Sequence, residues 1–463
     1  MSSISRYRPL ICASIALFCA SCQADRTLDD AATIPSAVTY AVRPAAGSEK
    51  VIYSFKNGAD GAVPMAGLIA DGGGNLYGTA TNVGGVGSCN IHCGVVFELS
   101  PPIKPRTAWK FSSLHAFTGG ADGGLPNGNV IFGPGGSLYG TANVGGGHTK
   151  FGAGVVFQLK PSGSRWTEKV LHRFGAGKDG RNPHGGLVAD ENGNLYGTTS
   201  GGGALGCTGG CGVVYELSPA AQGGLWTETI LHTFGGGGDG LIPIAGLAID
   251  RAGRLFGTTQ YGGHYSQYCQ GGCGSVFELT PPSSSGGQWT YATINRFAGG
   301  VPGDGALPYD PVVLDNAGNV YGTTFINQGA GGGTAFELIP SNHGETWTEN
   351  VLYRFPESSS DAGNPKAGFI FDRAGNLYAT SEEGGTGFQG TIFRLIPPAI
   401  LGGAWSDAVL FSFRAVRHGA TYPATNLVFG AGGLLYGTTQ YGGTGSCVFT
   451  RIKGCGTVFE FKQ

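Results

Sequence analysis

The stretch from Gly186 to Thr199, GLVADENGNLYGTT, contains the phrase Leu-Tyr-Gly-Thr that decides the fold. Copies or close variants of this phrase begin at residues 76, 138, 195, 255, 320, 377 and 435, about every 60 residues. A recurring period of this length, built from strand-like segments, is typical of a repeat architecture. The chain therefore consists of seven related units.

Each unit contains four short runs rich in β-branched and aromatic residues. In the third unit they cover residues 186–190, 194–199, 213–217 and 226–234, and the turn Glu191-Asn192-Gly193 joins the first two. Such runs, bounded by Gly, Pro, Asn and Asp, predict antiparallel strands of ~5 residues. Four strands repeated seven times predict an all-β, seven-bladed β-propeller with four antiparallel strands per blade.

The two ends of the repeat region indicate how the ring closes. The fourth-strand motif has an extra copy, Val51–Phe55, ahead of the first blade, and the last third-strand motif, 457–461, is followed by two residues. We expect this N-terminal segment to complete the last blade as its outer strand. Closure of this kind leaves no free sheet edge, which would favour aggregation.

Composition excludes several classes of protein. Hydrophobic residues make up 41 % and the net charge is −2, which argues against a disordered chain and against a basic nucleic-acid-binding surface. The tryptophans lie eight residues before a fourth-strand Phe, a regular placement that favours packing over ligand binding. They are Trp109, Trp166, Trp226, Trp289, Trp347 and Trp405.

The N-terminus has the features of an export signal, here assigned to residues 1–22. Arg6 and Arg8 precede an apolar run, 10–20, that is too short to span a bilayer. Lipidation of Cys22 and ordinary cleavage near Ala24 both stay open. Residues 23–48 are interpreted as a linker and 49–463 as the propeller, so we expect a protein of the periplasm, the outer membrane or the exterior that meets a membrane only through a lipid anchor.

The repeat unit resembles a known family. The phrase Gly-Asn-Leu-Tyr-Gly-Thr-Thr, then Gly-Gly, then Gly-Val-Val-Phe-Glu-Leu is similar to the GloVer-type (choice-of-anchor) tandem repeat of exported bacterial proteins. Blades six and seven depart from it with Ala379 for Gly and Leu434 for Asn. The resemblance implies an exported propeller-like protein and brings no catalytic residues with it.

Eight cysteines follow the signal and fall into local pairs between the second and third strands of four blades. An even count at repeated spacing in an exported protein predicts disulfides that fix these glycine-rich loops. Zinc ligation is the alternative, but it needs ligands from several blades. The pairs are Cys89 with Cys93, Cys207 with Cys211, Cys269 with Cys273, and Cys447 with Cys455.

A second repeated element, Asp-Gly four residues before a proline, precedes the first strand of most blades. We interpret it as a turn in which Asp caps backbone amides; calcium binding is the alternative, although one carboxylate per loop is few for this ion. In an up-and-down blade these loops share one face with the cysteine loops. The sequence predicts no resident metal or other cofactor.

Function is expected where the blades differ, at the residue after each repeat proline. This position places Asn127, His184, Tyr309 (followed by Asp310) and Lys366 at the channel mouth, with Glu382 in a neighbouring loop. Since no established catalytic motif is present, the first hypothesis is a monomeric binding or scaffold module for an unidentified ligand, a glycan or a protein. The alternative is a propeller enzyme, such as a lactonase, lyase or glycan hydrolase, with its site at the same mouth.

Overall fold

The computed structural model describes residues 47–463 except for short loop segments at 83–92, 148–151, 176, 204–205, 221–225, 268, 285, 301–302, 327–331, 342–345, 357–359, 401, 417, 424 and 450–451. The chain divides into two units, residues 1–43 and 44–463. The predicted signal, with Cys22, and residues 23–46 of the predicted linker lie outside the described residues, whereas Ser48, assigned to the linker, is the first residue of β1. Within the described part, no helix is long and apolar enough to cross a membrane.

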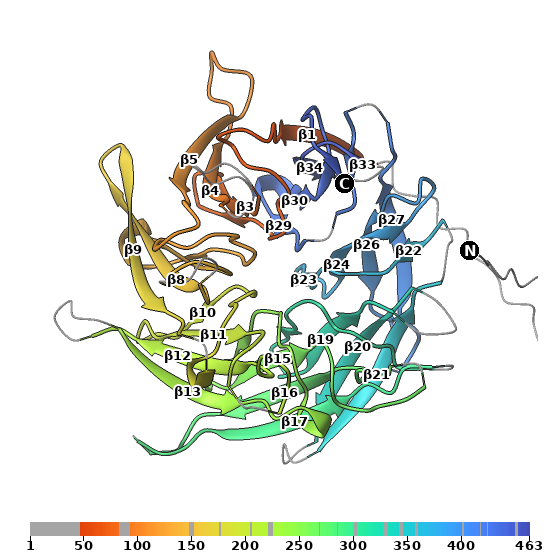
Figure 1. Ribbon diagram of the computed structural model, residues 1–463. Helices are drawn as coiled ribbons and strands as arrows, with labels where there is room; N and C mark the ends of the chain where they lie inside the picture. The colour runs from red at the N-terminus through yellow and green to blue at the C-terminus, as the bar shows by residue number, and fades with distance from the viewer. Residues whose placement is uncertain are drawn as a thin grey trace, which may run out of the picture. The chain divides into compact units, whose positions relative to one another are not determined.

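Seven four-stranded antiparallel sheets form the blades of a β-propeller (Figure 1), as predicted. Blade 1 contains β2 (Ile69–Ala70), β3 (Leu76–Ala80), β4 (Val95–Ser100) and β5 (Lys110–Ala116). Blade 2 contains β6 (Ile131–Phe132), β7 (Leu138–Ala142), β8 (Val155–Ser162) and β9 (Arg165–Arg173). Blade 3 contains β10 (Val188–Ala189), β11 (Leu195–Thr199), β12 (Val213–Ser218) and β13 (Thr227–Thr233). Blade 4 contains β14 (Ala248–Ile249), β15 (Leu255–Thr259), β16 (Ser275–Thr280) and β17 (Thr290–Arg296).

The remaining blades follow the same order. Blade 5 contains β18 (Val313–Leu314), β19 (Val320–Thr324), β20 (Thr334–Pro340) and β21 (Trp347–Arg354). Blade 6 contains β23 (Ile370–Phe371), β24 (Leu377–Ser381), β26 (Thr391–Ile396) and β27 (Ser406–Ser412). Blade 7 contains β29 (Val428–Phe429), β30 (Leu435–Thr439), β34 (Thr457–Lys462) and β1 (Ser48–Ser54). Short pairs are formed by β22 (Ala362–Gly363) with β25 (Glu383–Gly384), β28 (Ala420–Thr421) with β31 (Tyr441–Gly442), and β32 (Val448–Phe449) with β33 (Ile452–Lys453).

The N-terminal strand closes the ring. β1, red in Figure 1, pairs antiparallel with β34 near the C-terminus, blue, with Ser48 opposite Lys462 and Ser54 opposite Thr457. This confirms the predicted outer strand of the last blade. The innermost strands contain only two residues each, shorter than the predicted ~5. The backbone just before them lies against the next blade instead, where a Cβ on Gly128 would be 2.6 Å from the Gly185 carbonyl oxygen.

The phrase Leu-Tyr-Gly-Thr holds each blade together and joins it to the next. A Cβ atom on Gly197 would lie 2.4 Å from the Tyr215 hydroxyl oxygen, so the aromatic ring of the third strand requires glycine there. The Thr198 hydroxyl donates a hydrogen bond of 2.8 Å to the Ala245 carbonyl of the next blade. The same contact recurs at all seven boundaries, and Thr438 closes the ring by donating to the carbonyl of Ala66 at 3.1 Å.

Aromatic packing completes the boundaries at the outer strands. The Trp226 ring centroid lies 6.0 Å from that of Tyr139 in the preceding blade, and the Trp109 centroid lies 5.7 Å from that of Tyr436. Tryptophans of three further blades make the same type of contact with the preceding blade. The tryptophans therefore act as packing residues, as their regular spacing in the sequence predicts.

Candidate functional site

A cavity of about 530 Å³ lies at the axis, and all seven blades contribute to its lining. Its walls contain the segments that follow the repeat prolines, together with the first strands. Five of the six residues that the sequence places at the channel mouth line this one cavity: Asn127, His184, Tyr309, Asp310 and Lys366. The sixth, Glu382, is not among the lining residues but forms an ion pair with Lys366.

The backbone around the repeat proline fixes the direction of the lining residues. The residue before this proline has a positive φ in every blade; Ile242, for example, has φ 58°. This conformation is unfavourable for a β-branched residue and persists only where surrounding bonds impose it. Here the Ile242 N–H donates to the Cys211 carbonyl of the preceding loop at 2.9 Å, and its carbonyl accepts from the Gln260 N–H at 3.2 Å. The lining residue two positions later is therefore held rigidly.

One charged residue stands where the other blades have small residues. Asp310 follows the variable position, whereas the equivalent residues are Ala66, Gly128, Gly185, Ala245, Ala367 and Thr425. Space is limited at this level, since a Cβ on Gly185 would lie 2.4 Å from the Ala245 carbonyl carbon. Burial raises the pKa of the Asp310 carboxyl to about 8, against the opposing effects of the Gly368 N–H and the Lys366 charge. At neutral pH the carboxyl therefore carries a proton and can donate a hydrogen bond.

Lys366 is held in a defined position by a carboxylate and two aromatic rings. Its ammonium lies 2.6 Å from Glu382 Oε2, 5.4 Å from the Tyr309 ring centroid and 4.9 Å from that of Phe325. The two rings meet edge to face with centroids 5.1 Å apart. Because Glu382 neutralises Lys366, this wall of the cavity presents an aromatic surface without net charge.

In contrast to this aromatic wall, His184 and Asn127 supply hydrogen-bonding groups to the cavity. Burial lowers the pKa of the His184 imidazole, with its hydrogen bond to the Ile244 backbone acting in the other direction, so the ring is neutral at pH 7. The Asn127 side-chain oxygen is buried and has no hydrogen-bond partner within the described residues. A buried acceptor of this kind needs a donor from water or a ligand.

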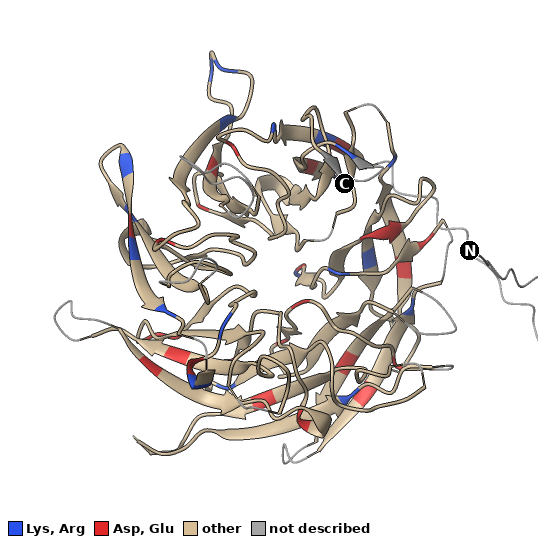
Figure 2. Cartoon of the chain, in the orientation of Figure 1, with Lys and Arg blue, Asp and Glu red and all other residues tan. Residues whose placement is uncertain are grey.

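The polar residues line one cavity but do not form a catalytic relay. Among the described residues, no hydrogen bond joins His184, Tyr309 and Asp310 to one another. Sequence reasoning did not single out Phe325 or Gln260 as site residues, although each lies two residues after the phrase of its own blade, in the loop that holds Glu382 in blade six. Acidic and basic segments are interspersed around the blades in Figure 2.

Three predicted disulfides are confirmed. Cys207–Cys211, Cys269–Cys273 and Cys447–Cys455 have Cα–Cα distances of 5.3, 5.1 and 5.1 Å. The fourth predicted pair includes Cys89, which lies outside the described residues. The carbonyl groups of Cys211, Cys273 and Cys455 accept the N–H of the strained residue before the next repeat proline. The disulfide loops therefore support the channel mouth.

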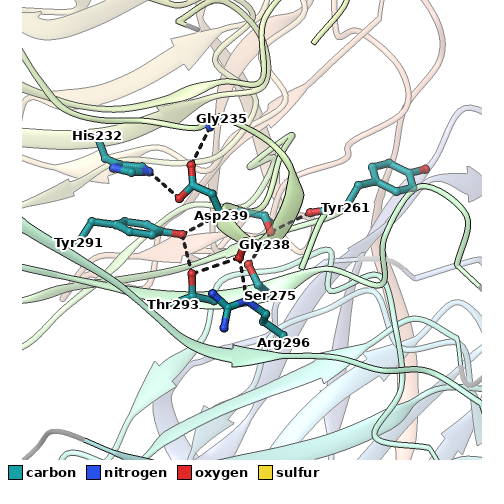
Figure 3. A network of polar contacts seen from close by, with 10 residues as sticks. His232, Gly235, Gly238, Asp239, Tyr261, Ser275, Tyr291, Thr293 and Arg296 are labelled. Carbon is teal, nitrogen blue, oxygen red and sulfur yellow. Dashed lines mark hydrogen bonds and ion pairs between the residues drawn. The ribbon is translucent and has the colours of Figure 1, made fainter. Parts of the chain in front are cut away.

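The Asp-Gly loops lie beside the cysteine loops, and their carboxylates bind backbone amides. Asp239 accepts from the Gly235 N–H at 2.6 Å, and Asp304 accepts from the Ala298 N–H at 2.9 Å. Asp239 also contacts His232 at 3.0 Å, which together with the Gly235 amide lowers the pKa of its carboxyl against the effect of burial (Figure 3). These contacts agree with the predicted capping role.

The comparison with protein families agrees with the repeat geometry. The model of the Gloeobacter/Verrucomicrobia repeat matches residues 27–269 and 265–463. The chain belongs to this family. The crystal structure of a protein of unknown function from Dyadobacter fermentans DSM 18053 is similar over 89 % of this chain and 96 % of that one, with 12 % identity and a TM-score of 0.41. None of the curated proteins matches this chain.

Membership of this family and the propeller fold suggest a binding or scaffold module. The three disulfides are typical of a protein of the periplasm or the cell exterior.

Proposed function

We propose that this protein is an exported binding module that holds the neutral end of a glycan in the channel-mouth cavity. The observation that carries the proposal is that the residues that vary among otherwise similar blades line one cavity of about 530 Å³. This volume is in the usual range for small-ligand sites, which is roughly 300–1,000 Å³. A monosaccharide or disaccharide unit fits such a volume.

The chemistry of the lining favours a neutral, hydroxyl-rich ligand. Tyr309 offers an aromatic face, protonated Asp310 offers a donor, and the unpartnered Asn127 oxygen offers an acceptor. Lys366 already has a carboxylate partner, so a charged ligand would have to compete with Glu382. Neutral sugars need aromatic contact and paired donors and acceptors, and they need no counter-ion.

A glycan array with the exported protein tests this proposal. We expect retention of neutral glycans, at least tenfold weaker binding by Asn127→Ala, His184→Ala and Lys366→Ala, and unchanged binding by Lys160→Ala, whose side chain is exposed on β8. If no neutral glycan binds, or if all variants bind like the wild type, the proposal is wrong. Preference for acidic glycans or capture of a protein ligand instead would also contradict it.

A second candidate function is supported by Asp310 alone. A carboxyl that keeps its proton at neutral pH inside a cavity has the property required of a general acid. Under this alternative the protein is a lyase, lactonase or glycan hydrolase. Chromatography of bound glycans after incubation distinguishes the two: products formed by the wild type but not by Asp310→Asn favour the enzyme, and intact glycans favour the binding module.

For the N-terminus we propose export with lipidation at Cys22, which would tether a monomeric propeller to the outer membrane through residues 23–48. The support is the sequence Cys19-Ala20-Ser21-Cys22 after an apolar run. Mass spectrometry of the mature N-terminus tests this: a diacylglyceryl-modified Cys22 is expected, and an unmodified start at Gln23 or later excludes the anchor.

A further inference from the structure

Each blade boundary contains three equivalent side-chain positions on its outer part. The first lies two residues before the fourth-strand Phe, the second is the Asp of the Asp-Gly loop, and the third lies six residues before the next fourth-strand Phe. Between blades 2 and 3 these positions hold His172, Asp179 and Glu228. One imidazole and two carboxylates thus come from β9, the connecting loop and β13.

The three residues have the geometry of a metal site. His172 Nε2 lies 3.1 Å from Asp179 Oδ1 and 3.6 Å from Glu228 Oε1, and all three ligand atoms lie within 4.8 Å of one another. Zinc binds imidazole nitrogen and carboxylate oxygen at about 2.0–2.2 Å, so tetrahedral ligands lie roughly 3.3–3.5 Å apart. The two separations from His172 Nε2, 3.1 and 3.6 Å, are close to this ligand-to-ligand distance.

The site contains a buried polar atom that protein groups leave unsatisfied. Within the described residues, Glu228 Oε1 has no hydrogen-bond partner, and His172 Nε2, at 3.6 Å, is beyond hydrogen-bond distance. A bound cation would satisfy this oxygen.

The next boundary shows that the fold does not require a carboxylate at this position. Between blades 3 and 4 the third residue is Tyr291, which stacks on His232 with ring centroids 3.7 Å apart (Figure 3). Its hydroxyl donates to the Asp239 carbonyl at 2.7 Å. The boundary is satisfied there by aromatic stacking and hydrogen bonds. A carboxylate stands at the third position of most boundaries, and between blades 1 and 2 the three residues are again His, Asp and Glu: His115, Asp122 and Glu168. Among the described residues, only His172, Asp179 and Glu228 bring their ligand atoms within 4.8 Å of one another.

We propose that His172, Asp179 and Glu228 bind a Zn²⁺ ion between blades 2 and 3, with water as the fourth ligand. A tetrahedral N/O site suits zinc, whereas calcium takes 6–8 oxygen ligands. The side chains are 17 %, 26 % and 16 % exposed, which leaves a path for the ion from solvent. The Gly175 N–H holds the second Asp179 oxygen and orients the carboxylate. The ion would join two blades, and this role is independent of the glycan site.

Calorimetric titration of the chelator-treated full chain with ZnCl₂ tests the proposal, with CaCl₂ in parallel. We expect one equivalent of Zn²⁺ with micromolar affinity, no uptake of Ca²⁺ at the same concentrations, and a higher Tm with Zn²⁺. Binding should weaken at least tenfold in His172→Ala and in Glu228→Gln, a substitution that preserves side-chain volume. Addition of Co²⁺ should give the intense visible absorption of tetrahedral cobalt in the wild type but not in His172→Ala or Glu228→Gln.

The matched control is His232→Ala at the boundary that lacks the acidic ligand, which should bind zinc like the wild type. If His172→Ala fails to fold, comparing the zinc binding of Glu228→Gln with that of the wild type still tests the proposal. Absence of stoichiometric zinc binding, or retention of it by Glu228→Gln, would overturn the proposal.

Discussion

Asp310 makes the stability of the propeller depend on pH in a way that one substitution can isolate. Its carboxyl has a pKa of about 8 in the folded protein, against an ordinary value of 3.8. Between these values the folded state holds a proton that the unfolded state has released. The free energy of unfolding therefore falls as pH rises from about 4 to about 8. Asp310→Asn removes this dependence because the amide does not titrate.

The magnitude follows from the size of the shift. Each pKa unit corresponds to about 1.4 kcal/mol, so a shift of about four units gives an upper limit of roughly 6 kcal/mol. Asp310 is only half-buried as a residue, and solvent screening reduces the energetic effect of its charge. We therefore expect the free energy of unfolding of Asp310→Asn, taken relative to that of the wild type, to rise by roughly 2–4 kcal/mol between pH 4 and pH 8.

Urea denaturation of both proteins at several pH values measures this difference. Other carboxyls with raised pKa values, such as Glu228 and Asp407, are present in both proteins, so their contributions cancel in the comparison. A stability difference that stays constant from pH 4 to pH 8 would refute a buried, protonated Asp310. A difference that changes in the opposite direction would indicate a carboxylate stabilised as the anion.

Three further predictions concern the blade boundaries. Thr198→Val should lower the free energy of unfolding by about 1–2 kcal/mol in urea, since it removes the donor to the next blade; equal loss in exposed Thr227→Val would contradict this. Ile242→Gly should be about 1 kcal/mol more stable than Ile242→Ala, because the φ of 58° favours glycine; thermal melts giving the usual reverse order would show that no strain is present. Replacing Cys207 and Cys211 by Ser should cost about 2 kcal/mol in chemical denaturation, the value for a short closed loop; an unchanged midpoint would rule out a stabilising role for the disulfide.

The fold was largely predictable because its signals are local and repeated. The phrase at 195–198 defines the second strand, and the copy at Val51–Phe55 indicates how the ring closes. The direction of the Thr198 hydroxyl was not predictable, because its acceptor belongs to a backbone about one repeat away. A regular spacing shows that a residue is structural, but not which neighbour it bonds.

The candidate site was predictable in outline only. Variation after the repeat prolines indicated the cavity-lining residues, since that position is the same in every blade. Asp310 keeps its proton because its carboxyl is buried where the channel is narrow. No local sequence pattern indicates the width of the channel at that level. Likewise, His172 and Glu228 meet only when two blades dock, although their regular distances from the fourth-strand Phe could have indicated it.

A crystal structure of the protein soaked with its best-binding neutral glycan tests the central claim most directly. We predict a sugar ring against Tyr309 in the channel-mouth cavity, with a hydroxyl donating to the Asn127 side-chain oxygen. A glycan bound on the outer strands or between blades, with the cavity holding only water, would contradict the account.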